Sequence, residues 1–192
     1  MKKKSEFRMT GETKKISPVR EKGTGELHSI ILQGNDYIHI PAPPYEIIDY
    51  NLRLYGSSLR GAKDSAEQIL ETSSMFPVAL GKENEWIWFM TEAMKNELCT
   101  WYALHHVKDI IEIGKKKAKI LLYCGYEEEL LVSKRSLKNR KDSGHRFQSK
   151  LFQITYPYPF LYSQPYEKFG MVSEREDVQY KIQKPKPDEK RE

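Results

Sequence analysis

Long hydrophobic runs and cysteines are both scarce in this sequence. No stretch approaches the roughly eighteen consecutive apolar residues that a membrane-spanning helix requires. Met1 and the three lysines after it are not followed by the apolar segment of a secretory signal. The chain has only two cysteines, Cys99 and Cys124, and without an export signal we expect reduced thiols rather than a disulfide. We therefore expect a soluble cytoplasmic protein with no membrane partner.

Recognisable catalytic motifs are also absent. The sequence contains no G-x-S-x-G, no Walker A loop, no H-E-x-x-H and no C-x-x-C. Carboxylates are abundant, but no pair stands out by position as a general acid and a general base. The sequence thus predicts a protein that is not an enzyme and that needs no cofactor or metal.

Positive charge, in contrast, is plentiful and unevenly placed. The chain has a formal net charge of +5 and an isoelectric point near 9.0. Residues 1–23 carry eight Lys or Arg against three Glu, and residues 134–150 carry seven against one Asp. Each of these segments is therefore at least as positive as the whole chain, so the remainder is net negative. Such concentration is compatible with an acidic partner.

Composition divides the 192 residues into one domain with two tails. Residues 1–25 are polar and lack apolar periodicity, which predicts a disordered basic arm. Residues 26–151 alternate apolar and turn-forming stretches and are predicted to fold. Residues 152–192 are rich in Tyr, Pro and charge, which is typical of a flexible tail.

Short β-prone runs dominate the predicted domain. Residues 27–33 and 37–40 flank a Gly-Asn-Asp turn and predict a hairpin. Further strands are predicted at 77–80, 85–91, 100–113, 118–123 and 129–133. Trp86, Trp88 and Phe89 fit a core strand better than a base-stacking platform. Sequential strands joined by short turns indicate an antiparallel β-meander.

Two helical segments accompany these strands. Apolar residues recur at helical spacing after Ser57 and Ser58, which predicts an amphipathic helix over 58–71. Residues 134–150 predict a basic helical segment with a sparse apolar stripe interrupted by Gly144. Residues 45–55 are ambiguous between a strand and a short helix. Together the elements indicate a single α+β domain.

The start of the 58–71 helix is a candidate phosphate site. A helix N-terminus offers unpaired N–H groups and the positive end of the helix dipole. Hydroxyl and cationic side chains gather there: Arg53, Ser57, Ser58, Arg60 and Lys63. A bound phosphate would satisfy them together. The alternative is a capped surface helix in which Asp64 and Glu67 neutralise the cations locally.

The basic segment 134–150 is a second candidate. Its predicted phosphate-binding side chains are hardly interleaved with acids: Lys134, Arg135, Lys138, Arg140 and Lys141. Clustered cations repel one another, and a polyanion relieves that repulsion while its condensed counterions are released. A solvated helix face or an acidic protein partner is the alternative.

Adjacent histidines at 105 and 106 raise the question of a metal or an acid–base site. On the strand predicted for residues 100–113, His105 and His106 would point to opposite faces and could not chelate one metal together. We expect one face of this strand to pack in the core, with a partly exposed histidine on the other. A phosphate-contacting or pH-sensitive histidine, or an enzyme that uses one of the two, remains the alternative.

Four ordered motifs resemble the ComK family, the competence transcription factors of Gram-positive bacteria. The first is Leu54-Tyr55-Gly56-Ser57-Ser58 with Arg60-Gly61 and Lys63, and the second is Trp88-Phe89-Met90-Thr91. The third runs from Trp101 to His105-His106-Val107-Lys108, and the fourth from Leu131-Val132-Ser133 to Ser136-Leu137 and Asn139. The resemblance spans residues 26 to about 150.

The resemblance implies a cytoplasmic, nucleoid-associated activator of DNA-uptake genes. Family members bind A/T-rich boxes in double-stranded DNA as oligomers, largely through the minor groove, where a narrow groove concentrates negative potential. They are also controlled by proteolytic adaptors that bind short C-terminal segments. The matching candidate segment here is Phe160, Leu161 and Tyr162. A protein-interaction module, or a diverged regulator without a DNA-uptake role, is the alternative.

The sequence departs from the family pattern at several points. Met75-Phe76-Pro77-Val78 stands where the family has Lys-Pro-Pro-Ile, and Met90 stands where it has proline. Cys124-Gly125 replaces an Asn-Gly turn. The stretch after Asn139 is more basic and less apolar than the family helix.

Overall fold

The computed structural model describes residues 6–71, 74–81 and 85–156 of the chain. The chain divides into two compact units, residues 1–154 and 155–192. The first unit holds every described strand and all but the last residue of the described helices. Within the described ranges, no helix combines the length and the apolarity needed to cross a bilayer.

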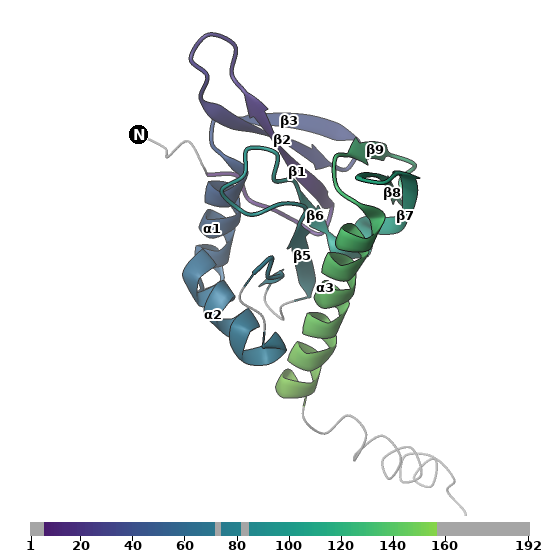
Figure 1. Ribbon diagram of the computed structural model, residues 1–192. Coiled ribbons are helices and arrows are strands. Elements are labelled where there is room, and N and C mark those ends of the chain that lie inside the picture. Colours follow the sequence, from purple (N-terminus) through teal and green to yellow (C-terminus); the bar gives the residue numbers. More distant parts are fainter. Residues whose placement is uncertain (1–5, 72–73, 82–84, 157–192) are drawn as a thin grey trace, which may run out of the picture. The chain divides into compact units, whose positions relative to one another are not determined.

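A six-stranded antiparallel sheet forms the centre of the first unit, in the order β3-β2-β1-β6-β5-β4 (Figure 1). Its strands are β1 (Thr13–Arg20), β2 (Leu27–Gln33), β3 (Asp36–Ile40), β4 (Val78–Leu80), β5 (Trp86–Met90) and β6 (Trp101–Ala103). β1 pairs with both β2 and β6 and so joins two runs of sequential strands. The predicted α+β class and the predicted 27–33/37–40 hairpin are confirmed.

A second, three-stranded antiparallel sheet follows, with the order β7-β8-β9. It consists of β7 (Val107–Gly114), β8 (Lys117–Leu122) and β9 (Glu127–Leu130). A 3-10 turn, η1 (Leu104–His106), separates β6 from β7. The single strand predicted over 100–113 is therefore wrong at its centre, because the chain leaves the first sheet at Leu104 and starts the second at Val107. No glycine or proline marks this break.

Three α-helices complete the described structure: α1 (Pro44–Leu54), α2 (Leu59–Leu70) and α3 (Lys134–Thr155). α1 begins with Pro44, whose fixed φ suits a first helical position. α2 confirms the helix predicted over 58–71, with Ser58 as its N-cap. α3 confirms the basic helical segment and continues through residues 152–155, which the sequence assigns to a flexible tail.

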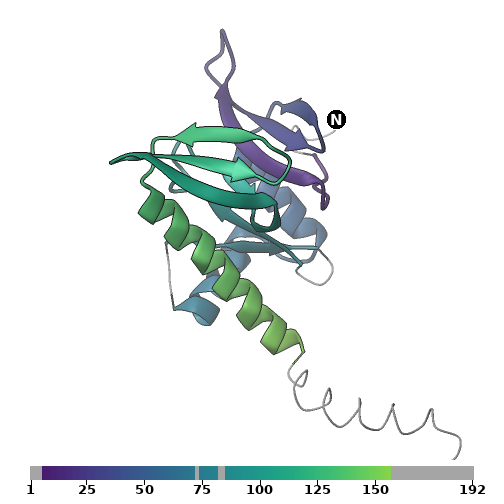
Figure 2. The same cartoon turned by 90° about the vertical axis from the view of Figure 1, so that its right-hand side faces the viewer.

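The helices lie on opposite faces of the central sheet (Figures 1 and 2). Side chains alternate across a strand, so neighbouring residues of β5 face opposite ways. The Trp86 ring packs edge-on against Tyr55 at the end of α1, with 6.4 Å between ring centroids. A Cβ placed on Gly144 of α3 would lie 3.7 Å from Ile87. α1 and α2 thus cover one face, and α3 covers the other.

The core lies between these layers and is rich in aromatic side chains. The largest fully buried side chains include Trp88, Phe89, Trp101, Tyr102 and Phe147. Trp88 and Phe89 of β5 are 1% and 0% exposed, which confirms their predicted place in a core strand. None of these five rings is available to stack on a nucleic-acid base.

The N-terminal segment corrects one prediction. Residues 13–20 fall within the predicted disordered arm, yet they form β1 at the middle of the sheet. The segment before β1 is also held: the Met9 N–H donates to Asn51 Oδ1 at 2.8 Å, and Asn51 Nδ2 donates to the Phe7 carbonyl at 2.7 Å. The strand escaped prediction because Lys14 and Lys15 lower its hydrophobicity, although both are largely buried.

Candidate nucleic-acid interface

The two faces of α3 differ sharply in composition. Leu137, Gly144 and Phe147 are buried at helical spacing against the rest of the unit. Away from that stripe the helix exposes five cations: Lys134, Arg135, Lys138 and Arg146, which form its exposed basic face, and Lys150, which reaches the Ile69 carbonyl of α2. At 3.6 residues per turn, Arg135, Lys138 and Arg146 project within the same half of the helix. The apolar stripe therefore fixes which of the basic residues face solvent.

The exposed cations of α3 have little negative charge around them. Asp142 is the single acidic residue of the helix. The ion pairs among the described residues include none with Lys134, Arg135, Lys138 or Arg146. An approaching polyanion would therefore meet cations that no carboxylate among the described residues already holds.

Arg140, in contrast, turns into the protein. It is part-buried, and its Nη1 atom is buried without a hydrogen-bond partner. Burial lowers the pKa of the guanidinium, and the charge of Glu92 partly opposes that shift. The structure thus does not bring Arg140 to the exposed basic face. Its spacing of three residues from Leu137 was the signal that could have placed it in the buried stripe.

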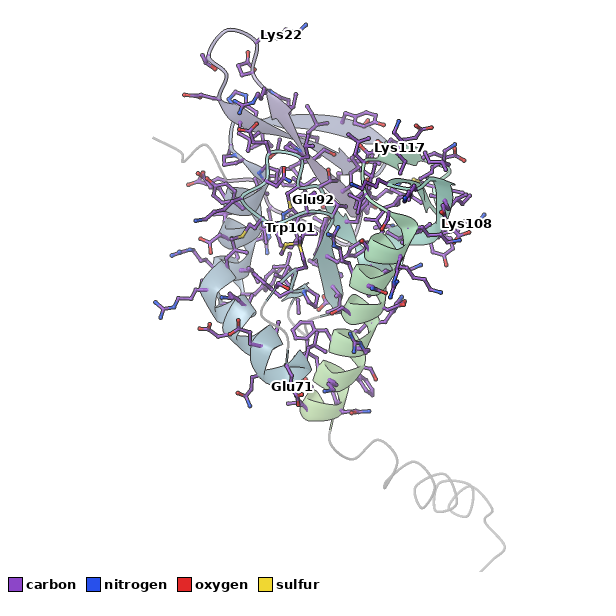
Figure 3. All side chains as sticks on the ribbon, viewed as in Figure 1. Lys22, Glu71, Glu92, Trp101, Lys108 and Lys117 are labelled. Carbon is purple, nitrogen blue, oxygen red and sulfur yellow. The ribbon has the colours of Figure 1, made fainter. Side chains whose placement is uncertain are left out.

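Lys141 lies at the flank of α3 beside the second sheet. Its Nζ donates to the Val107 carbonyl at 3.2 Å, where β7 begins. The next residue, Lys108, is exposed and projects outward next to α3 (Figure 3). Sequence reasoning missed Lys108 as part of this surface because only the tertiary contact between α3 and β7 brings it there.

At the start of α2, protein groups already satisfy part of the predicted phosphate site. Ser58 Oγ accepts a hydrogen bond from the Gly61 N–H at 3.1 Å. Asp49 Oδ1 accepts one from the Leu59 N–H at 2.8 Å. Asp49 also brings a carboxylate to this end of the helix dipole, where negative charge is favourable. No local pattern pointed to Asp49, which reaches α2 across the turn from α1.

Two of the three cations near this helix start have carboxylate partners. Arg53 Nε lies 2.7 Å from Asp49 Oδ2, and Lys63 Nζ lies 3.4 Å from Glu67 Oε1. Arg60 is exposed, and the ion pairs among the described residues do not include it. Glu67 thus neutralises Lys63 locally, as the alternative of a capped surface helix predicted.

The residues predicted to contact DNA therefore fall into two separate groups. One group lies at the start of α2 and the other along α3, and the two helices cover opposite faces of the central sheet (Figures 1 and 2). The helices approach each other only near their C-terminal ends, where Lys150 Nζ donates to the Ile69 carbonyl at 2.8 Å. Of the two groups, α3 carries more unpaired positive charge.

The adjacent histidines hold the N-terminal segment instead of lying on the predicted strand. His105 and His106 both lie in η1, with ring centroids 4.2 Å apart, so the prediction that they face opposite ways is wrong. Both Nε2 atoms lie near the Gly11 carbonyl, at 3.1 Å and 2.8 Å. Burial lowers the pKa of His106, which favours its neutral, N–H-donating form. The pair anchors the segment that leads into β1.

Comparisons with known proteins point to the same family as the four sequence motifs. A family model described as ComK protein matches residues 4–154. The competence transcription factor of Bacillus subtilis (strain 168) is 24% identical over 134 residues, which span 70% of this chain and 69% of that protein. No solved structure matches the chain.

Proposed function

This chain belongs to the ComK protein family, and we propose that it is a DNA-binding transcription regulator of genetic competence. The observation that carries the proposal is the exposed face of α3, whose four cations lack carboxylate partners among the described residues. The name of the Bacillus relative supplies the biological role. As a transcription regulator of this kind, the protein acts in the cytoplasm at the nucleoid and has no catalytic step.

The dimensions of α3 suit a duplex. Its 22 residues make a helix roughly 33 Å long, close to the length of one turn of B-DNA. Lys134 and Lys138 lie near the start of α3 and Arg146 lies beyond its middle, so phosphates on both sides of a groove fall within reach. Each contact releases condensed counterions, which makes the affinity depend on salt.

The proposed base preference follows from the same charges, and the proposed protein partners follow from the family resemblance. A narrow A/T-rich minor groove concentrates negative potential and favours arginine, so Arg135 and Arg146 are our candidates for groove contacts. Arg60, with the Ser57 and Ser58 hydroxyls, would add a phosphate contact at α2. The partners that we propose are A/T-rich double-stranded DNA, a second copy of the chain, and a proteolytic adaptor at residues 160–162, which lie outside the described residues.

Fluorescence anisotropy with A/T-rich and G/C-rich duplexes over a salt series tests this proposal. We expect tighter binding to the A/T-rich duplex and a linear fall of log K with log salt, with a slope of about −0.9 per neutralised phosphate. Lys138→Gln should weaken binding to both duplexes and reduce that slope by about one. Arg60→Gln measures separately whether the start of α2 takes part.

Lys22→Gln is the matched control. Lys22 lies in the β1–β2 loop, remote from α3 (Figure 3). The substitution removes the same charge, so a general electrostatic effect would appear in both variants. Equal binding by Lys138→Gln, Lys22→Gln and the parent chain, or binding that salt does not weaken, would contradict the proposed interface.

A further inference from the structure

Three potential metal ligands converge where β1, β2 and β3 lie side by side. Glu21 directly follows β1, His28 lies on β2, and His39 lies on β3. His28 Nδ1 is 3.1 Å from His39 Nε2 and 3.3 Å from Glu21 Oε2. The third separation, from His39 Nε2 to Glu21 Oε2, is 3.9 Å. The three side chains thus contribute one donor atom each to a common point.

These separations match the edges of a metal coordination tetrahedron. Bonds of about 2.0–2.2 Å at tetrahedral angles place neighbouring donor atoms roughly 3.3–3.5 Å apart. The observed distances of 3.1, 3.3 and 3.9 Å bracket that value, so an ion needs only small side-chain adjustments to enter. Three protein ligands leave the fourth position for water.

Glu26 adds a second carboxylate on the other side of the His28 ring. Glu26 Oε2 lies 3.6 Å from His28 Nε2, and that nitrogen is buried with no hydrogen-bond partner. Histidines that bind a metal through one ring nitrogen commonly donate the other N–H to a carboxylate, which fixes the tautomer. A small approach of Glu26 would complete that arrangement here.

Each ring nitrogen of His28 therefore faces a group suited to a metal site. Nδ1 lies beside both other donor atoms, His39 Nε2 and Glu21 Oε2, and Nε2 faces the Glu26 carboxylate. The rival explanation is a hydrogen bond between the His28 and His39 rings with no ion bound.

We propose that Glu21, His28 and His39 form a site for a divalent transition metal of the zinc type, with Glu26 as a positioning residue. Two imidazole nitrogens and one carboxylate oxygen suit Zn²⁺ better than Mg²⁺ or Ca²⁺, which prefer oxygen ligands. A bound ion would join β1, β2 and the edge strand β3. The site adjoins Lys22, on the opposite side of the unit from α3 (Figure 3), so it stands independently of DNA binding.

Isothermal titration of the full chain with ZnCl₂ in a non-chelating buffer tests the site. We expect one zinc ion per chain, and the same site should give Co²⁺ the intense visible absorption of tetrahedral coordination. His39→Ala removes a half-exposed ligand. Loss of a residue that only hydrogen-bonds to a ligand typically weakens metal binding roughly 10–100-fold, so loss of the ligand itself should weaken zinc binding more than that. Glu26→Gln should weaken it by about tenfold.

His145→Ala and Cys124→Ser are the matched controls, because each removes another exposed zinc-binding side chain. Both variants should bind zinc as the parent chain does. The proposal is overturned if the parent chain binds no zinc, if His39→Ala binds it unchanged, or if either control abolishes binding. An NMR titration in which zinc leaves the ring signals of His28 and His39 unchanged would overturn it in favour of the hydrogen-bonded histidine pair.

Discussion

At the scale of single residues, the two cysteines illustrate how surroundings set reactivity. Cys99 is 2% exposed, and its thiol donates to the Glu92 carbonyl at 3.2 Å. Burial raises its pKa to about 11, and the charge of Glu92 adds to that shift. Cys124 is exposed in the turn after β8. Both cysteines are free thiols, as the sequence indicated.

We expect a thiol reagent at pH 8 to modify one cysteine per native chain rapidly. At that pH a thiol with a pKa near 11 is only about one part in a thousand thiolate, and thiolate is the reacting form. Absorbance on reaction with a chromogenic disulfide measures the count. Cys124→Ser should abolish the fast phase, whereas Cys99→Ala should preserve it. Two fast thiols in the folded parent chain would contradict this assignment.

Sequence reasoning at this scale succeeded where the determining contact is local. The sequence offered Ser57 or Ser58 as the N-cap of α2, and Ser58 fills that place because a capping serine and its partner N–H, here that of Gly61, lie within one helical turn. Asp49 escaped notice because it reaches Leu59 across a turn between two helices. Arg140 was placed on the wrong side of its helix because the apolar stripe that sets the phase is sparse.

At the scale of elements, α3 depends on a close approach to the sheet at Gly144. A Cβ there would lie 3.4 Å from both Leu104 methyl carbons and 3.7 Å from Ile87, which is the near limit of ordinary contact. The sequence suggested that this glycine interrupts the apolar stripe of the helix, yet Gly144 is itself buried between Leu137 and Phe147 in that stripe. Gly144 instead lets α3 pack closely against Leu104 and Ile87.

We expect Gly144→Ala to stabilise the protein slightly, by about 0.5 kcal/mol. Alanine gains roughly 0.8–1.0 kcal/mol of helix propensity over glycine, and mild crowding against Leu104 offsets part of that gain. Gly144→Leu should lower stability by about 1–3 kcal/mol, because its side chain overpacks the same contact. Denaturant unfolding of both variants measures these changes. An alanine variant less stable than the parent would mean that the contact admits no added methyl group.

Elements with a regular local pattern were predicted well, and the others were not. The β2–β3 hairpin and α2 follow from a turn signal and from helical periodicity, respectively. β1 was missed because its polar residues find buried partners only in the folded protein. The break between β6 and β7 was missed because η1 depends on a distant carbonyl, that of Gly11, rather than on a local breaker.

At the scale of the whole first unit, a polar cluster connects the two sheets. Lys15 of β1 is 4% exposed, and its Nζ lies 2.7 Å from Glu128 Oε2 of β9 and 2.6 Å from the Tyr126 hydroxyl. The Tyr102 hydroxyl of β6 also donates to Glu128. Burial, with the charge of Glu128, raises the pKa of Tyr126 to about 12. These partners lie up to 113 residues apart, beyond the reach of any local sequence pattern.

We expect Glu128→Gln to lower the free energy of unfolding by about 2–3 kcal/mol, because it leaves the Lys15 ammonium buried without a counter-charge. Removing one partner of a buried ion pair costs about 3–5 kcal/mol, and partial exposure of Glu128 reduces that cost. Glu127→Gln is the matched control: its neighbouring pair with Lys119 is solvent-exposed, so the unfolding midpoint should stay unchanged. Adding Lys15→Met to Glu128→Gln should recover much of the loss, since the unpaired charge is then gone. Equal effects of Glu127→Gln and Glu128→Gln in denaturant unfolding would mean that the Lys15 pair does not hold the two sheets together.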